Sequence, residues 1–151
     1  MKILPTLVAV AAGLAAAGTP LSAQTRPDNR ALLTGLTAAA AKPGDSVEVT
    51  DETRNLGGRP TVSTEIEFWL NSRSDTTNGG IRLSPATKQV VQLNPNGVHL
   101  RRTGERKLTI PRGVTNRGPQ FIIGYVRPVA MESNIGNNLA SVPINITPPV
   151  E

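Results

Sequence analysis

Cysteine is absent from the 151-residue sequence, histidine occurs once and aromatic residues number four. The lack of cysteine excludes a disulfide framework, thiol catalysis and cysteine–metal sites. A single histidine, His99, supplies too few ligands for a zinc site. Four aromatic side chains are too few for a platform on which nucleic-acid bases stack. We therefore expect no cofactor and no nucleic-acid partner.

Catalytic motifs are also lacking. There is no G-x-S-x-G nucleophile motif. His99 follows the turn-forming residues 94–97, so we expect it in a solvent-facing loop. Glu65 and Glu67 lie two residues apart, and we interpret them as one solvated face of a strand. The sequence thus predicts a protein that is not an enzyme, with an enzyme using these groups as a remote alternative.

The first 23 residues have the pattern of a secretory signal peptide. Lys2 precedes an apolar run over residues 3–17, and Ala23 offers a small residue at the predicted cleavage site. The run is shorter than the ~20 residues that a helix needs to cross a bilayer. We therefore expect a cleaved signal peptide rather than a transmembrane anchor, and a protein that is periplasmic, at the cell surface or secreted.

The remaining chain is typical of an all-β domain. Twelve of the fourteen glycines and eleven of the thirteen prolines lie in it and divide it into short segments, and no helix is predicted. Residues 61–70 alternate, which predicts Val62, Ile66, Phe68 and Leu70 inside and Trp69 on the solvent side. We expect a tail at 24–30, one domain at 31–147, and a C-terminal tail at 148–151. Its strands are predicted at 31–36, 46–54, 61–70, 88–93, 106–110, 121–126 and 139–146.

Several short motifs follow one another in a recognisable order. Their order and spacing resemble the CARDB family, a cell-adhesion-related domain found in bacteria. The motifs are Asn55-x-Gly57, residues 68–72, residues 121–125, and Glu132-Ser133-Asn134-x-x-Asn137-Asn138 before residues 142–144. The resemblance implies an immunoglobulin-like antiparallel β-sandwich of about seven strands. It also implies a non-catalytic interaction or adhesion module whose partner is another envelope or extracellular protein.

The chain departs from the acidic pattern that CARDB domains often carry. Arg127 stands where an Asp is frequent, and Ile135 or Gly136 replaces a further acid. The loop after Ser72 keeps only Asp75 and Asn78 as candidate calcium ligands, and calcium needs six to eight oxygens. We therefore expect no metal. A structural role in turns is predicted instead for Asn55, Gly57, Asn134, Asn137 and Asn138.

Two groups of side chains are candidates for binding a partner. Basic residues cluster around the turn at 103–105, namely Arg101, Arg102, Arg106 and Lys107. They predict attraction to an anionic glycan or another polyanion, and scattered solubilising charge is the alternative. Trp69, if exposed, is able to anchor a protein or stack on a sugar, and shielding by residues 72–80 is its alternative. A protein-interaction module is the leading hypothesis, and a glycan or polyanion binder is the second.

Overall fold

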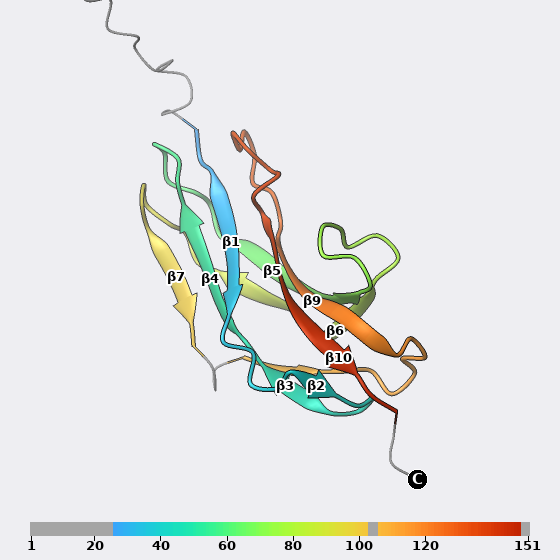
Figure 1. Ribbon diagram of the computed structural model, residues 1–151. Helices are drawn as coiled ribbons and strands as arrows, with labels where there is room; N and C mark the ends of the chain where they lie inside the picture. Colours follow the sequence, from blue (N-terminus) through green and yellow to red (C-terminus); the bar gives the residue numbers. More distant parts are fainter. Residues whose placement is uncertain (1–25, 103–105, 149–151) are drawn as a thin grey trace, which may run out of the picture.

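The computed structural model describes residues 26–102 and 106–148 (Figure 1). The predicted signal peptide and the turn at 103–105 lie outside the described residues. Within them all regular structure is β-strand, and no helix is long and apolar enough to span a membrane. The strands are β1 (Asn29–Thr34), β2 (Ala40–Ala41), β3 (Ser46–Glu48), β4 (Thr50–Asn55), β5 (Thr64–Asn71), β6 (Ile81–Val90), β7 (Val98–Arg101), β8 (Lys107–Thr109), β9 (Gly118–Val126) and β10 (Leu139–Ile146).

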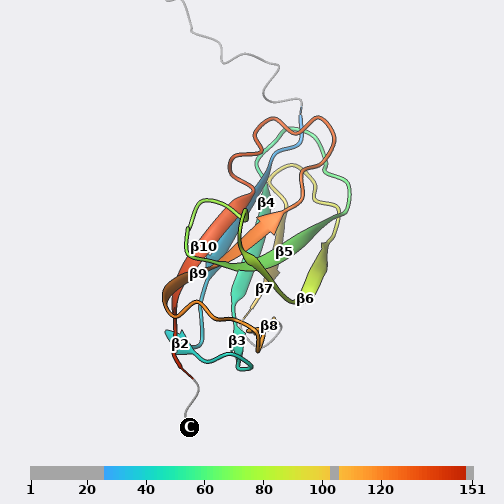
Figure 2. The same cartoon turned by 90° about the vertical axis from the view of Figure 1, so that its right-hand side faces the viewer.

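The strands form two sheets. One has three strands in the order β1-β4-β7, and the other has seven in the order β2-β10-β9-β5-β6-β8-β3. All the strand pairs are antiparallel except β2 with β10. Figures 1 and 2 show the three-stranded sheet along one side of the curved seven-stranded sheet.

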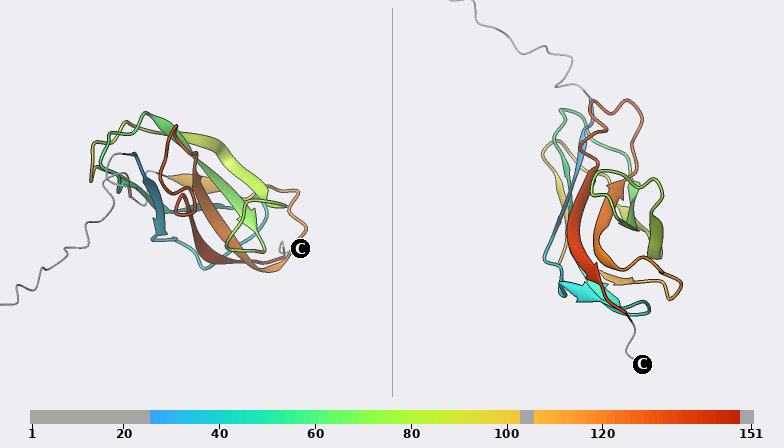
Figure 3. Two further views of the ribbon diagram at one scale, coloured as in Figure 1. Left: turned by 90° about the horizontal axis from the view of Figure 1, so that it is seen from above. Right: turned by 45° about the vertical axis from the view of Figure 1, so that its right-hand side comes forward.

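The two sheets are joined by one continuous stretch of chain. β3 belongs to the seven-stranded sheet, and after the buried Val49 the chain continues as β4 in the three-stranded sheet. Figure 3 shows the larger sheet curving toward the smaller one, which gives a partly closed, barrel-like arrangement rather than two separate flat layers. The prediction of an all-β fold is confirmed. The prediction of a two-layer β-sandwich is too simple, because the larger sheet curves into this barrel-like arrangement.

Aliphatic side chains from both sheets fill the core. Ile66, Phe68 and Leu70 point inward from β5, as their alternation predicts. On β9, Gly124 permits close packing, because a Cβ atom there would lie 3.2 Å from Leu33 on β1. Leu108 and Ile110 also point inward, and the predicted last strand over 139–146 is confirmed.

Some elements differ from the sequence-based expectation. β1 begins at Asn29, inside the segment predicted as a tail. β6 begins at Ile81, seven residues before the predicted strand at 88, and it contains Pro85, which normally argues against a strand. β7 was not predicted at all, because its four residues are too few to show a pattern. Val62 precedes β5 and is exposed, so its inward assignment is wrong.

The inward face of β4 is polar throughout. Asp51, Thr53 and Asn55 are all fully buried. Arg106, which precedes β8, donates two hydrogen bonds to the Asp51 carboxylate, at 3.0 Å from Nε and 3.1 Å from Nη2. The Arg106 guanidinium also lies 4.7 Å from the ring centre of Phe68 on β5. This buried ion pair therefore connects the three-stranded sheet to the seven-stranded sheet.

Burial and pairing act in opposite directions on this pair. Burial raises the pKa of the Asp51 carboxyl, and the positive charge of Arg106 opposes that rise. Burial likewise lowers the pKa of Arg106. Each charge is tolerated in the interior because the other is hydrogen-bonded to it.

We expect Arg106→Ala to lower the free energy of unfolding by about 3–5 kcal/mol, because it leaves the Asp51 carboxylate buried and unpaired. The double variant Asp51→Leu with Arg106→Met should recover most of this loss, since it removes both charges and keeps similar volumes. Urea unfolding followed by circular dichroism measures both. A double variant as unstable as the single one would contradict this explanation.

Candidate functional site

Three of the four aromatic side chains lie on the outer face of the seven-stranded sheet. Trp69 pairs with Ile123, and across the same strands Glu67 pairs with Tyr125 and Asn71 with Phe121. Paired residues of an antiparallel sheet share a face, and the alternate residues of β5 point into the core. Phe68 is the one aromatic residue in the core. The protein thus places most of its aromatic surface outside its core.

Glu67 is the centre of a hydrogen-bonded cluster on this outer face. Its carboxylate accepts bonds from Arg127 Nε at 2.6 Å, Arg82 Nη2 at 2.8 Å and Trp69 Nε1 at 3.2 Å. Arg127 also pairs with Glu65 at 2.8 Å. The bond to Glu67 is the main reason that the pKa of Arg127 is raised. We call Glu67, Trp69, Arg82 and Arg127 the Glu67 cluster.

The Glu67 cluster holds Trp69 in place. The Trp69 side chain is half-buried, and the Arg82 guanidinium lies 5.7 Å from its ring centre. The interpretation of Glu67 as a solvated carboxylate is wrong, because its partners leave it only 8% exposed. Sequence reasoning missed the roles of Arg82 and Arg127, since β6 and the end of β9 meet β5 only in the folded sheet.

A shallow groove lies on the same sheet, where β9 begins and β10 ends. It has a volume of about 290 Å³ and is lined by Ala39, Pro119, Gln120, Phe121, Pro143, Ile144 and Asn145. Pro143 pairs with Phe121 across β9 and β10, so these two side chains lie on the outer face. The outer face therefore combines a charged, ordered cluster around Trp69 with an apolar groove beside Phe121.

The predicted basic cluster is not assembled as one exposed patch. Arg106 was predicted as a surface residue, and this is wrong because its side chain is fully buried against Asp51. Arg101 is half-buried, and it donates to the carbonyl of Gln89 at 2.7 Å and to His99 Nε2 at 2.9 Å. Arg102 and Lys107 are exposed. Because Arg106 is buried, Arg102 and Lys107 are the exposed members of the predicted basic cluster.

His99 also differs from its prediction. It lies in β7 rather than in a loop, and it is half-buried. It pairs with Thr53 of β4, so it shares the inward face of the three-stranded sheet. Its Nε2 accepts a hydrogen bond from the Arg101 guanidinium at 2.9 Å, and its charge interacts with that of the buried Asp51.

The Asn-rich segment before β10 is held by bonds to its own surroundings. Glu132 accepts from the backbone N–H groups of Asn29 at 2.7 Å and Val129 at 2.9 Å. Asn138 donates to the Val126 carbonyl and to Glu132, both at 3.2 Å. Asn137 donates to Asp28 at 3.0 Å, and Asn134 accepts from the Gly136 N–H at 3.0 Å. These bonds fix the connection from β9 to β10 against the start of β1.

Asn55 and Gly57 fix the connection that follows β4. The buried Asn55 amide oxygen accepts from the backbone N–H groups of Asp28 at 3.1 Å and Gly57 at 2.9 Å. Its Nδ2 donates to the carbonyls of Arg59, Leu93 and Asn94. A Cβ atom on Gly57 would lie 2.0 Å from the Arg26 carbonyl, so only glycine fits there. This pair ties three segments together at one end of the domain.

The candidate calcium ligands are engaged elsewhere. Both carboxylate oxygens of Asp75 accept bonds from Arg73, at 3.1 and 2.9 Å. The bond from Arg73 also lowers the pKa of Asp75. The backbone carbonyl of Asn78 accepts a hydrogen bond from Asn71 Nδ2 at 3.0 Å. In the described part of the chain, no group of three or more His, Cys, Asp or Glu side chains is placed to hold a metal ion.

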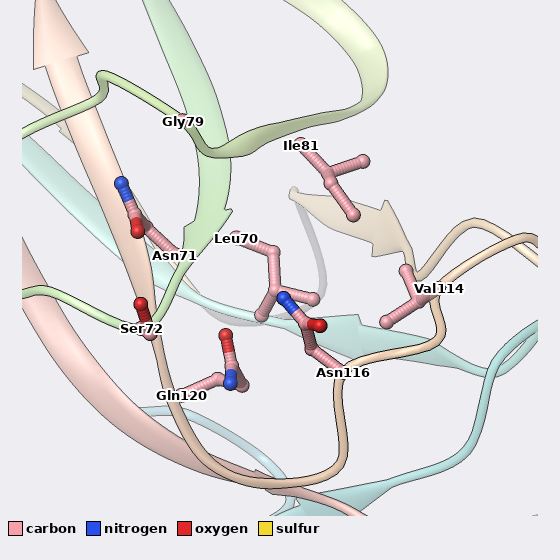
Figure 4. A pocket seen from close by; sticks show the side chains of 8 residues that line it. All are labelled: Leu70, Asn71, Ser72, Gly79, Ile81, Val114, Asn116 and Gln120. Carbon is pink, nitrogen blue, oxygen red and sulfur yellow. The ribbon is translucent and has the colours of Figure 1, made fainter.

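A small polar cavity lies where β5 ends. Figure 4 shows the side chains of Asn71, Asn116 and Gln120 around it, with Leu70, Ile81 and Val114 on its apolar side. Its volume of about 20 Å³ matches a single water molecule. This cavity is too small for a substrate.

Comparison with solved structures identifies the architecture. The crystal structure of the CARDB domain of the PF1109 protein from Pyrococcus furiosus, in complex with di-metal ions, has a TM-score of 0.56 and 21% identity, covering 86% of this chain and 98% of that one. The solution structure of the same domain has a TM-score of 0.53 and 22% identity, covering 81% and 96%. This chain has the fold of a CARDB domain. The resemblance predicted from the short motifs is confirmed as a likeness of fold.

Other comparisons add less. A β-glucosidase from Listeria innocua in complex with laminaribiose has a TM-score of 0.51 and 12% identity over 83% of this chain, but only 17% of the enzyme is covered. No protein-family model and no curated protein matches the chain. The CARDB-like fold is therefore established by shape, and the site must be interpreted from its own residues.

We expect Glu67→Ala to release Trp69, because it removes the acceptor that the indole and two arginines share. The Trp69 emission should shift to longer wavelength and be quenched more by acrylamide, and the free energy of unfolding should fall by about 1–3 kcal/mol. The protein has one tryptophan, so the signal is unambiguous.

Glu65→Ala is the matched control, because Glu65 is more exposed than Glu67 and pairs with Arg127 alone. It should leave the emission unchanged. Equal effects of the two substitutions would refute the assignment of Glu67 as the centre of the cluster.

Proposed function

We propose that this protein is a non-catalytic, exported interaction module. In this proposal it is an immunoglobulin-like domain that follows a signal peptide cleaved after Ala23. It binds another envelope or extracellular protein through the outer face of the seven-stranded sheet. The CARDB-like fold supports an adhesion-related role, and the signal-peptide pattern supports export.

The placement of the aromatic residues carries the proposal. Trp69, Phe121 and Tyr125 lie on a face where they contribute little to the core. Aromatic residues and arginine are enriched in the interfaces and hot spots of protein complexes. Because the Glu67 cluster already orders Trp69, Arg82 and Arg127, a partner that docks here loses less side-chain freedom on binding.

The described residues support binding rather than catalysis. The polar cavity at the end of β5 has room for about one water molecule, and the groove beside Phe121 is apolar in most of its lining. The carboxylates of Glu65 and Glu67 are both paired with Arg127. These arrangements offer neither a free acid nor a free base beside a cavity of substrate size.

A glycan is the second candidate ligand. The half-buried Trp69 with Arg82 beside its ring supports this alternative, since aromatic rings stack on sugars and arginine binds acidic groups. Arg101 and Lys107 lie in β7 and β8 and Arg102 follows β7, so these residues are outside the Glu67 cluster. The protein partner is favoured because Phe121, Tyr125 and the groove extend the surface beyond one sugar ring.

We expect Trp69→Ala to reduce retention of the protein on its native envelope fraction at least about tenfold, because it truncates a central aromatic anchor. Leu32→Ala is the control, since Leu32 pairs with Glu52 on the outer face of the other sheet. Retention is measured by co-sedimentation after proteolysis or periodate oxidation of the fraction.

Loss of retention after proteolysis of the fraction supports a protein partner. Retention that survives proteolysis but not periodate would overturn it in favour of a glycan. Equal retention of the Trp69→Ala and Leu32→Ala variants would contradict the proposal that the outer face of the seven-stranded sheet is the binding surface.

A further inference from the structure

Three connections meet at the end of the domain where β1 begins. β4 ends there at Asn55, which pairs with Asn29, and β6 ends there at Val90, which pairs with Thr64. β9 and β10 are joined there by residues 127–138, and the Ala31 N–H donates to the Asn137 carbonyl at 3.0 Å. We call residues 56–63, 91–97 and 127–138 the loop end; it lies at the top of Figure 1.

Exposed apolar side chains are concentrated at the loop end. Across the residues that the structure describes, seven large hydrophobic side chains are exposed. Leu100 and Val98 lie in β7, with Val98 directly beside the loop end, and the other five lie in the loop end: Leu56, Val62, Val91, Met131 and Ile135. All three connections contribute. Single exposed apolar residues are normal, whereas a concentration at one end indicates a contact surface.

The two most prominent apolar residues of the longest connection are held in place. Met131 is 67% exposed and has a φ of +62°, a left-handed conformation that is uncommon for a residue other than glycine. The neighbouring Glu132 fixes it by accepting bonds from Asn29 and Val129. Ile135 is 62% exposed in the same connection. The fold thus stabilises a strained backbone that presents an apolar side chain to solvent.

The acidic and basic side chains at the loop end differ in their exposure. Glu132 and Asp28 are bonded within the protein, to Asn29 and Asn137 respectively. Arg26 and Arg59 are exposed, and their backbone carbonyls contact Gly57 and Asn55. Of these four charged residues, the two arginines are therefore the more exposed, and they lie beside an apolar surface.

The chain also enters the domain at this end. Arg26 is the first described residue, and the apolar segment 3–17 of the predicted signal peptide lies upstream of it. A signal peptide enters the membrane during export. Before cleavage after Ala23, the predicted signal peptide is therefore connected to the domain at the loop end.

We infer that the loop end docks on a lipid surface that carries anionic headgroups. The aliphatic side chains enter the boundary between headgroups and acyl chains, and the guanidinium groups of Arg26 and Arg59 meet lipid phosphates. A lipid surface fits better than a protein, because the apolar side chains project singly from three connections. Neither the groove beside Phe121 nor the cavity at the end of β5 lies among them.

The test is co-sedimentation with vesicles of phosphatidylcholine alone or mixed with phosphatidylglycerol, using the protein as its host processes it. The wild type should bind the anionic vesicles more tightly, and the double variant Met131→Asp with Ile135→Asp should bind them at least about tenfold more weakly. Arg59→Glu should weaken binding to the anionic vesicles only. Unchanged melting temperatures and Trp69 emission establish that the variants are folded.

Leu100→Asp is the matched control, since Leu100 is an exposed aliphatic residue outside the loop end. It should bind like the wild type.

The lipid proposal is overturned if the wild type binds neither vesicle or if the double variant binds as well as the control. It is also overturned if the double variant loses envelope retention but keeps vesicle binding, which would indicate a protein at the loop end. Trp69→Ala should retain vesicle binding, so this test is independent of the outer face.

Discussion

The buried ion pair between Asp51 and Arg106 is the contact on which the arrangement of the two sheets depends. It places two charges in the interior, where each is acceptable only with the other beside it. Its members come from different sheets, and Phe68 packs against the guanidinium. Neighbouring Asn29 and Thr53 carry buried polar atoms without a protein partner. The region between β1, β4 and β8 is therefore polar, and its geometry is set by hydrogen bonds as well as by apolar packing.

The partly polar interior around Asp51 and Arg106 is consistent with a core that contains few aromatic residues. Aliphatic side chains from both sheets fill the remainder of the interior, and Phe68 is the one aromatic residue among the described core residues. Trp69, Phe121 and Tyr125 are then available for the outer face. The same strand, β5, supplies core residues on one side and Glu67 and Trp69 of the Glu67 cluster on the other, so the proposed binding face lies directly on the core.

The sequence predicted those parts of the fold that depend on residues close together along the chain. The alternation in β5 identified Ile66, Phe68 and Leu70, and the Asn-rich segment located the start of β10. The burial of Arg106 was not predictable, because it depends on Asp51, 55 residues away. Glu67 was misinterpreted for the same reason, since its partners come from β6 and from the residue after β9. Pairing between distant strands decides which charged residues are buried, and a single sequence does not show it.

In our proposal, the outer face of the seven-stranded sheet contacts a partner protein. Photocrosslinking tests this contact, with a photoreactive phenylalanine analogue placed at Thr87, which pairs with Glu67, and separately at Thr34, on the outer face of the other sheet. After irradiation in the native envelope fraction, we expect one defined protein adduct from Thr87 and none from Thr34. Equal adducts from both positions, or an adduct from Thr34 alone, would contradict the claim.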